Sequence, residues 1–162
     1  MNNMFYYCES LTSIPQLDTS NVTRMQNMFY GCKKLKTIPQ LQTSKVTMIN
    51  NMFQNCHELI TIPLLDTSNV TNMNQMFYNC FNLKEVPQLD TSNVTTMSYI
   101  FNNCSKLSNE SLNNILAMCS NATKYTGTKT LVYIGLSSAQ ATICQSLSNY
   151  QAFLDAGWTT GY

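Results

Sequence analysis

A cysteine returns at a constant interval over the first two thirds of this chain, and the residues around it return with it. The cysteines are Cys8, Cys32, Cys56, Cys80 and Cys104, each 24 residues after the one before. A fixed period of roughly 20–50 residues is the signature of a repeat array, whose units bury their apolar faces only against their neighbours. The interval therefore predicts a stack of coils over residues 1–107.

The positions that stay constant between coils are almost all apolar. Each cysteine is followed by a leucine, an isoleucine or valine, a second leucine and a valine, and phenylalanine precedes the next cysteine. After Cys32 these residues are Leu35, Ile38, Leu41, Val46 and Phe53. Constant apolar positions predict one interior layer of side chains per coil.

Two local structures are expected within each coil. The segment Leu35–Pro39 fits a short strand that ends at proline, because proline cannot donate a hydrogen bond to a ladder. Asp18 and its neighbours offer N-cap side chains, and the next apolar residues have the spacing of one or two helical turns. These apolar residues are Val22, Met25, Met28 and Phe29. The sequence thus predicts an α/β repeat solenoid with short parallel strands and helical turns.

The repeat register stops at residue 107, and residues 108–162 predict a closing α/β cap made of a helix, a strand and a second helix. Ser108 is placed to cap the first helix. The apolar side of this helix carries Leu112, Ile115, Leu116 and Cys119. The β-branched and aromatic run Thr130–Ile134 predicts the strand.

Ser137 and Gln140 have capping-box spacing and open the second predicted helix. Its apolar face is marked by Ile143, Leu147, Tyr150 and Leu154. Gly157 follows as a stop, and Trp158 is then available to cover the last coil.

Composition excludes two classes of partner. Charged residues make up 10% of the chain and the net charge is +1, which provides no electrostatic footprint for nucleic acid or an anionic membrane. No apolar run approaches the roughly 20 residues that span a bilayer. Nothing resembles a secretory signal peptide, since the chain starts inside the repeat pattern. Solubility must come from Asn, Thr, Ser and Gln, which suits an extracellular or cell-surface protein.

The repeat itself carries a resemblance. Its pattern Met-Phe-x-x-Cys-x-x-Leu-x-x-Ile-Pro-x-Leu-Asp-Thr-Ser-Asn-Val-Thr resembles the BspA-like leucine-rich repeat surface proteins over residues 1–107. Many of those proteins are bacterial surface lipoproteins. The resemblance implies a right-handed leucine-rich-repeat-like coil, surface exposure, and a role in adhesion or recognition. The chain departs from ordinary leucine-rich repeats because Leu-x-x-Ile-Pro-x-Leu replaces their Leu-x-Leu strand core.

The cysteine ladder invites a metal or disulfide interpretation. Neighbouring copies have Cα atoms about 5 Å apart, which is inside the disulfide window. Stacked side chains of one orientation nevertheless point alongside one another, and no Cys-x-x-Cys spacing occurs. Buried free thiols are therefore predicted for the ladder. Cys119 and Cys144 lie on different cap elements and stay a candidate pair.

The other candidate groups predict no catalytic or metal site and no cofactor. The methionine ladder has the softness that Cu(I) prefers, but methionine beside phenylalanine at core spacing indicates packing. His57 is the single histidine, so a nucleophile–base pair has little to build on. Asp18, Asp66 and Asp90 recur where Gln42 stands in another coil, which favours capping over calcium binding. Three Asn-Val-Thr glycosylation sequons, at Asn21, Asn69 and Asn93, are explained by the repeat alone.

Variation between coils is the one functional indication. It is concentrated at the first, second and fourth residues after each cysteine, and extended repeat surfaces of this kind bind partners. The candidate binding residues, predicted to share one exposed face, are Lys33, Lys36, His57, Ile60, Phe81 and Lys84. Drift on an unselected solvent face is the alternative explanation.

The sequence therefore predicts a non-enzymatic recognition or adhesion module at the cell surface or outside the cell, with a protein or glycan as its partner. The alternative is a structural repeat or fibre subunit, such as a phage fibre tip or a filament, that self-associates through its first coil. Met1 already occupies a repeat position, so Met4, Phe5 and Leu11 are expected to lack stacking partners on one side. Such an edge would fray or associate.

Overall fold

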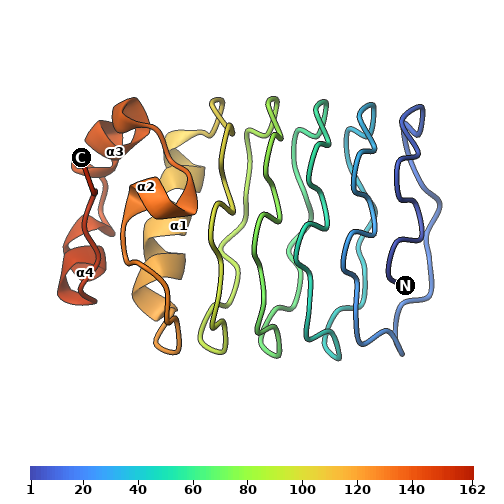
Figure 1. Cartoon of the computed structure of the whole chain (residues 1–162), viewed down its shortest axis with the longest axis horizontal. Helices are drawn as coiled ribbons and strands as arrows, with labels where there is room; N and C mark the ends of the chain where they lie inside the picture. Colours follow the sequence, from blue (N-terminus) through green and yellow to red (C-terminus); the bar gives the residue numbers. More distant parts are fainter.

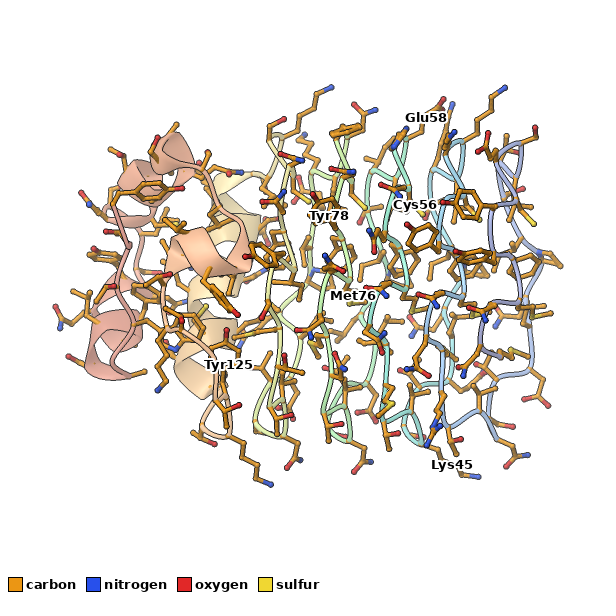
Figure 2. All side chains as sticks on the ribbon, in the orientation of Figure 1. Lys45, Cys56, Glu58, Met76, Tyr78 and Tyr125 are labelled. Atoms are coloured by element: carbon orange, nitrogen blue, oxygen red, sulfur yellow. The ribbon has the colours of Figure 1, made fainter.

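The computed structural model describes residues 1–162 as a stack of coils closed at one end by helices (Figure 1). Each coil passes along one side of the stack and returns along the other, so equivalent positions of successive coils lie side by side. In Figure 2 the side with Met76 and Tyr78 faces the viewer, and we call it the front. We call the edge with Glu58 the upper rim and the edge with Lys45 the lower rim.

The front of each coil is held by hydrogen bonds that alternate between two directions. In the second coil the N–H groups of Met25, Asn27 and Phe29 donate to carbonyls of the next coil, at 2.9–3.2 Å. The N–H groups between them instead close local turns, as when Met28 N–H donates to Met25 O at 3.2 Å. The N–H groups of Met25 and of Asn27–Cys32 thus all have partners, as buried backbone requires.

This alternation depends on a left-handed backbone at two places in each coil, five residues and one residue before the cysteine. These residues are Asn3, Asn27, Asn51, Gln75 and Tyr99, and Tyr7, Gly31, Asn55, Asn79 and Asn103, with φ from 54° to 74°. Asn and Gly tolerate this conformation better than other residues. The predicted helical turns are therefore wrong: the coils contain consecutive tight turns, because a helix cannot include a left-handed residue every few positions.

The predicted short strands are also absent from the coils. Parallel pairing is limited to isolated bridges such as Arg24 with Met48, Asn72 with Thr96, and Thr61 with Glu85. Along the predicted strand segments few N–H groups reach the neighbouring coil, as from Ile60 to Lys36 O and from Lys84 to Ile60 O, so no continuous ladder forms.

The interior consists of columns of identical side chains. Phe5, Phe29, Phe53, Phe77 and Phe101 stack face to face, with ring centroids 5.4–5.6 Å apart. Beside this column, the Cys56 thiol donates to Phe29 O at 3.1 Å, and Cys32, Cys80 and Cys104 repeat the contact one coil apart. The apolar positions that the sequence assigned to the interior are buried from Met25 onward.

The first coil is less well covered. Met4 is exposed, and Phe5 and Leu11 are only partly buried, whereas Phe29 and Leu35 at the same positions are fully buried. The difference follows from stacking, because these side chains have a neighbouring coil on one side only.

Four helices form the cap: α1 (Asn109–Asn121), α2 (Leu131–Ile134), α3 (Ser138–Cys144) and α4 (Tyr150–Asp155). Helix α1 begins as predicted, with the Ser108 side chain accepting from Ser111 N–H. The capping box of Ser137 and Gln140 is likewise confirmed at the start of α3. Trp158 is buried against Tyr125 and Phe153, at centroid distances of 5.1 and 6.1 Å.

Two cap predictions are wrong. The predicted strand Thr130–Ile134 is the short helix α2, capped by the Thr130 side chain and ended by left-handed Gly135. Its carbonyls accept from the front of the last coil, Tyr133 O from Tyr99 N–H and Ile134 O from Phe101 N–H, both at 2.9 Å. That tertiary contact outweighs the strand propensity of the sequence.

The predicted second helix is divided into α3 and α4, separated by residues 145–149. Ile143 and Leu154 are exposed instead of marking a buried face. The break orients Asn149 towards α1, where its side chain donates to Asn113 O at 3.0 Å.

The phenylalanine column provides a stability test. Phe53→Ala should lower the free energy of unfolding by about 3–5 kcal/mol, because it opens a cavity in the middle of the column. Phe81→Ala, a control on the upper rim, should change it by less than about 0.5 kcal/mol. Urea denaturation followed by circular dichroism measures both values, and equal losses would contradict the assignment of Phe53 to the interior.

Candidate functional site

The structure brings the six sequence-predicted binding residues together on the upper rim. Lys36, Ile60 and Lys84 occupy the same position in successive coils: Ile60 N–H donates to Lys36 O at 3.0 Å, and Lys84 N–H to Ile60 O at 2.9 Å. All three side chains are exposed. Lys33, His57 and Phe81 form a second row on the same rim, in which Phe81 is exposed and the other two are half-buried. Whether this surface binds a partner stays a prediction.

The centre of the rim is apolar. The rings of His57 and Phe81 lie 4.9 Å apart, and Asn82 Nδ2 donates to His57 O at 3.0 Å. Phe81 is 42% exposed and Ile60 is 45% exposed. Partial burial, followed by the positive charge of Lys33, lowers the pKa of His57 below its ordinary value. At neutral pH His57 therefore contributes a neutral ring beside Phe81.

Lysines surround this centre. Lys36 Nζ lies 3.9 Å from Glu58 Oε2, and Lys106 Nζ donates to Asn82 Oδ1 at 2.6 Å. An open groove of about 480 Å³ is lined by Lys36, Glu58, Ile60, Asn82, Lys84 and Lys106. Exposed ion pairs contribute only about 0–1 kcal/mol to stability. The lysine ammonium groups thus remain available to an acidic partner.

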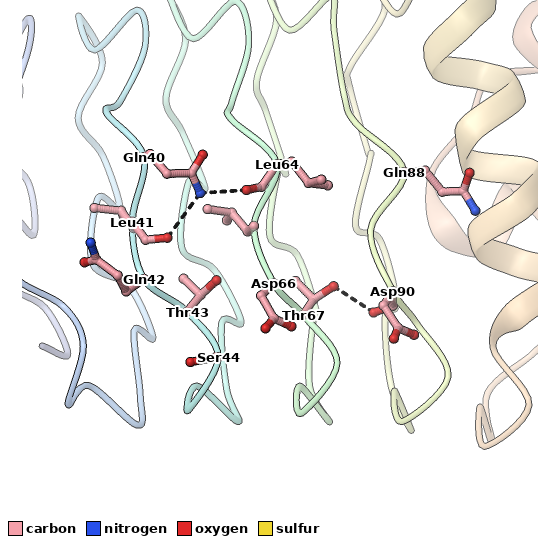
Figure 3. A pocket seen from close by; sticks show the side chains of 11 residues that line it. Gln40, Leu41, Gln42, Thr43, Ser44, Leu64, Asp66, Thr67, Gln88 and Asp90 are labelled. Atoms are coloured by element: carbon pink, nitrogen blue, oxygen red, sulfur yellow. Dashed lines mark hydrogen bonds between the residues drawn. The ribbon is translucent and has the colours of Figure 1, made fainter.

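A second groove, of about 500 Å³, lies on the back of the stack, the side opposite the front, towards the lower rim (Figure 3). Gln40 Nε2 crosses it and donates to Leu41 O at 3.2 Å and Leu64 O at 2.8 Å. The Asp66 carboxylate accepts hydrogen bonds from the hydroxyl and the backbone N–H of Ser68. Both contacts lower the pKa of Asp66, and the hydroxyl lowers it more. Asp18 and Asp90 accept from the backbone N–H two residues later in the same way. Local capping by these aspartates is therefore confirmed, although they cap turns and not helices.

The cysteine ladder is buried as predicted, with one exception. Cys32, Cys56, Cys80 and Cys104 are free and buried, whereas Cys8 in the first coil is exposed. Burial raises the pKa of Cys32 to about 12 and the pKa of Cys56 well above its ordinary value. Cys119 and Cys144, the candidate pair in the cap, are both free and buried.

No group of three or more His, Cys, Asp or Glu side chains is arranged to hold a metal ion. No helix has the length and apolarity needed to cross a membrane.

Sequence reasoning missed the amides of the front. Asn51 Nδ2 donates to Asn27 Oδ1 at 3.0 Å, and Asn79 Nδ2 donates to Asn55 Oδ1 at 2.8 Å. The available signal was asparagine recurring five residues and one residue before the cysteine. It indicates both a left-handed backbone and a stack of side-chain amides.

One comparison with known proteins gives a match. The family described as "Mycoplasma protein of unknown function, DUF285" matches residues 1–115, which span every coil and the first half of α1. The chain belongs to this family. No curated protein and no solved structure matches the chain. The family description assigns no activity, so a function for this DUF285 protein has to be argued from its surfaces.

Thiol reactivity tests the ladder. Only the thiolate reacts with alkylating reagents, so the buried thiols of Cys32, Cys56 and Cys80 should stay unmodified in the native protein at pH 8. Cys8 should be labelled at once. Mass spectrometry after brief exposure to iodoacetamide identifies the modified positions, and the same treatment in urea is the control. Rapid native labelling of the three buried thiols would contradict their placement.

Proposed function

We propose that this chain is a non-enzymatic recognition module, exposed at the cell surface or outside the cell, whose upper rim binds an acidic protein or glycan. The observation that carries the proposal is an exposed apolar pair, Ile60 and Phe81, flanked by Lys36, Lys84 and Lys106. Exposed apolar side chains with a polar surround are typical of interaction sites.

The chemistry of the rim suits such a partner. Phe81, already in contact with His57, provides a large apolar contact that is fixed in position before binding. Lysines around it would attract an acidic partner and raise the association rate, more strongly at low salt. The ion pairs on this rim are exposed and therefore weak, so exchanging them for contacts with a partner costs little.

The resemblance of the repeats to BspA-like leucine-rich repeat surface proteins supports the same function. The repeated contacts between coils support the interpretation of the stack as a leucine-rich-repeat-like solenoid, and such arrays present extended binding surfaces.

Charge reversal on the upper rim tests the proposal. The wild-type chain should bind immobilised heparin or at least one acidic matrix glycoprotein, with an affinity that falls as salt is raised. Lys36→Glu with Lys84→Glu should weaken that binding by about tenfold or more. Surface plasmon resonance gives the affinities.

The matched control carries the same change of charge on the lower rim, at Lys45→Glu and Lys124→Glu. These lysines contact Asn21 and Asn93, away from the groove. The proposal is wrong if no acidic polymer or glycoprotein binds, or if both double variants bind equally.

A second candidate function is assembly of a fibre through the first coil. The carbonyls of Met28 and Tyr30 accept hydrogen bonds from the coil before them, whereas those of Met4 and Tyr6 accept none. Tyr6 and Tyr7 are also exposed there. Unpaired edges with apolar side chains promote association.

Hydrogen exchange at several protein concentrations tests this alternative. Amides of the first coil, up to Leu11, should exchange faster than those of later coils, and they should become protected where sedimentation shows oligomers. Uniform protection from Leu11 to Leu107 in a strict monomer would exclude both fraying and assembly at this edge.

A further inference from the structure

The front of the stack has an unusual surface composition. Its outward positions are the two residues before and the two residues after each methionine–phenylalanine or isoleucine–phenylalanine pair of the coils, and none of them is charged. All are amides or tyrosines except Ser98 and Gly31. The amides are Asn2, Asn3, Gln26, Asn27, Asn50, Asn51, Gln54, Asn55, Asn74, Gln75, Asn79, Asn102 and Asn103, and the tyrosines are Tyr6, Tyr7, Tyr30, Tyr78 and Tyr99. We call this surface the amide face.

Hydrogen bonds along the stack fix the orientation of six of these amides, which form two ladders. Asn51 Nδ2 donates to Asn27 Oδ1, whose own Nδ2 donates to Asn3 Oδ1, both at 3.0 Å. A second ladder joins Asn103 to Asn79 and Asn79 to Asn55, at 2.8 Å. A primary amide has two N–H groups and two lone pairs. An amide inside a ladder uses one of each, which leaves one donor and one acceptor for a ligand.

Aromatic rings lie at both ends of the amide face. Tyr6 stacks on Tyr30 with centroids 5.0 Å apart, and Tyr99 lies 5.5 Å from Tyr133 of α2. The Tyr7 ring lies over Gly31, where an added Cβ would come within 2.9 Å of it. Gly31 interrupts the second amide column and makes room for this ring. Tyr78 stands between the two aromatic groups (Figure 2).

We propose that the amide face binds an uncharged, extended β-linked polysaccharide, laid along the stack across successive coils. Donor–acceptor pairs on fixed amides match the neighbouring hydroxyls of a pyranose ring, and tyrosine rings pack against its C–H faces. The face carries no charge that would favour an anionic ligand. Because the ladders hold the amides in place before binding, little side-chain entropy is lost.

The spacing distinguishes a polysaccharide from a peptide. Backbones joined by hydrogen bonds lie about 5 Å apart, and the ring centroids of the phenylalanine column are 5.4–5.6 Å apart. An extended β-1,4-linked hexose chain advances by nearly the same distance per sugar. Two residues of an extended peptide advance about 6.6 Å, so a peptide would lose register within a few coils. The backbone N–H groups of Asn27–Cys32, Asn51–Cys56 and Gln75–Cys80 are also all occupied, which leaves no donors for strand addition there.

Binding of defined oligosaccharides tests the proposal. Cellohexaose and chitohexaose are titrated into the full chain by calorimetry. Cellobiose is the control for length, and maltohexaose, a hexamer whose chain is curved, is the control for shape. At least one of the two extended hexamers should bind about tenfold or more tightly than cellobiose and maltohexaose, because only it spans several coils.

Three variants separate recognition from folding. Asn51→Gly with Asn79→Gly removes two amides but keeps the left-handed backbone that glycine accepts, and Tyr78→Leu removes a ring. Each should weaken hexamer binding by about tenfold. Gln88→Ala removes an exposed amide from the groove on the back of the stack, away from the amide face, and should leave binding unchanged.

Three outcomes would overturn the proposal: no binding of either extended hexamer, equal binding of maltohexaose, or wild-type affinity in both the Asn51→Gly with Asn79→Gly variant and Tyr78→Leu. An oligomer that Asn51→Gly with Asn79→Gly dissociates would assign the amide face to a second copy instead. The upper rim is tested by different substitutions, so failure of either proposal leaves the other standing.

Discussion

A single coil of this chain has no interior, because it contributes only one side chain to each column. Its backbone pairs with the next coil through every second N–H of the front, as at Met25, Asn27 and Phe29, while the intervening N–H groups close turns. This alternation pairs each residue with the residues one 24-residue repeat further along the chain. Because of this offset, phenylalanine stacks on phenylalanine and cysteine lies beside cysteine. Surface residues obey the same offset. The ladders of asparagine and the row of Lys36, Ile60 and Lys84 are therefore consequences of the backbone register that builds the core.

The burial of the coils could be predicted from the sequence, but their secondary structure could not. The repeat period and the polarity of each position identify which residues face inward, and Leu35, Phe53 and Val70 are fully buried as expected. The spacing of Val22, Met25, Met28 and Phe29 is equally compatible with a helix and with consecutive turns, and a left-handed residue every few positions decides between them. In the cap, α1 and the start of α3 were predictable because capping is local. Helix α2 was not, because the last coil needs its carbonyls as acceptors.

The candidate site was predicted in part. The upper-rim residues could be grouped from sequence because one repeat position in successive coils must lie in one row. The amide face was missed because constant positions were taken to serve folding and variable positions to serve binding. Asn27 and Asn55 serve the fold and also lie on the surface: the left-handed backbone selects asparagine, and the offset between coils then aligns its amide with the next. In a repeat array a constant residue can lie on the surface.

Sparse charge gives each side of the stack a different chemistry. Only 10% of the residues are charged, and many of them are sorted by position: lysines lie on the upper rim together with Glu9, Glu58 and Glu85, aspartates line the groove on the opposite side from the front, and the amide face has no charged side chain. Screening limits the reach of such charges to about 10 Å or less at physiological salt, so a partner at one side is little affected by the others. An acidic partner would be attracted to the lysines of the upper rim, while a neutral ligand would depend on shape and hydrogen bonds at the front. Raising the salt concentration should therefore weaken binding at the rim and leave binding at the amide face nearly unchanged.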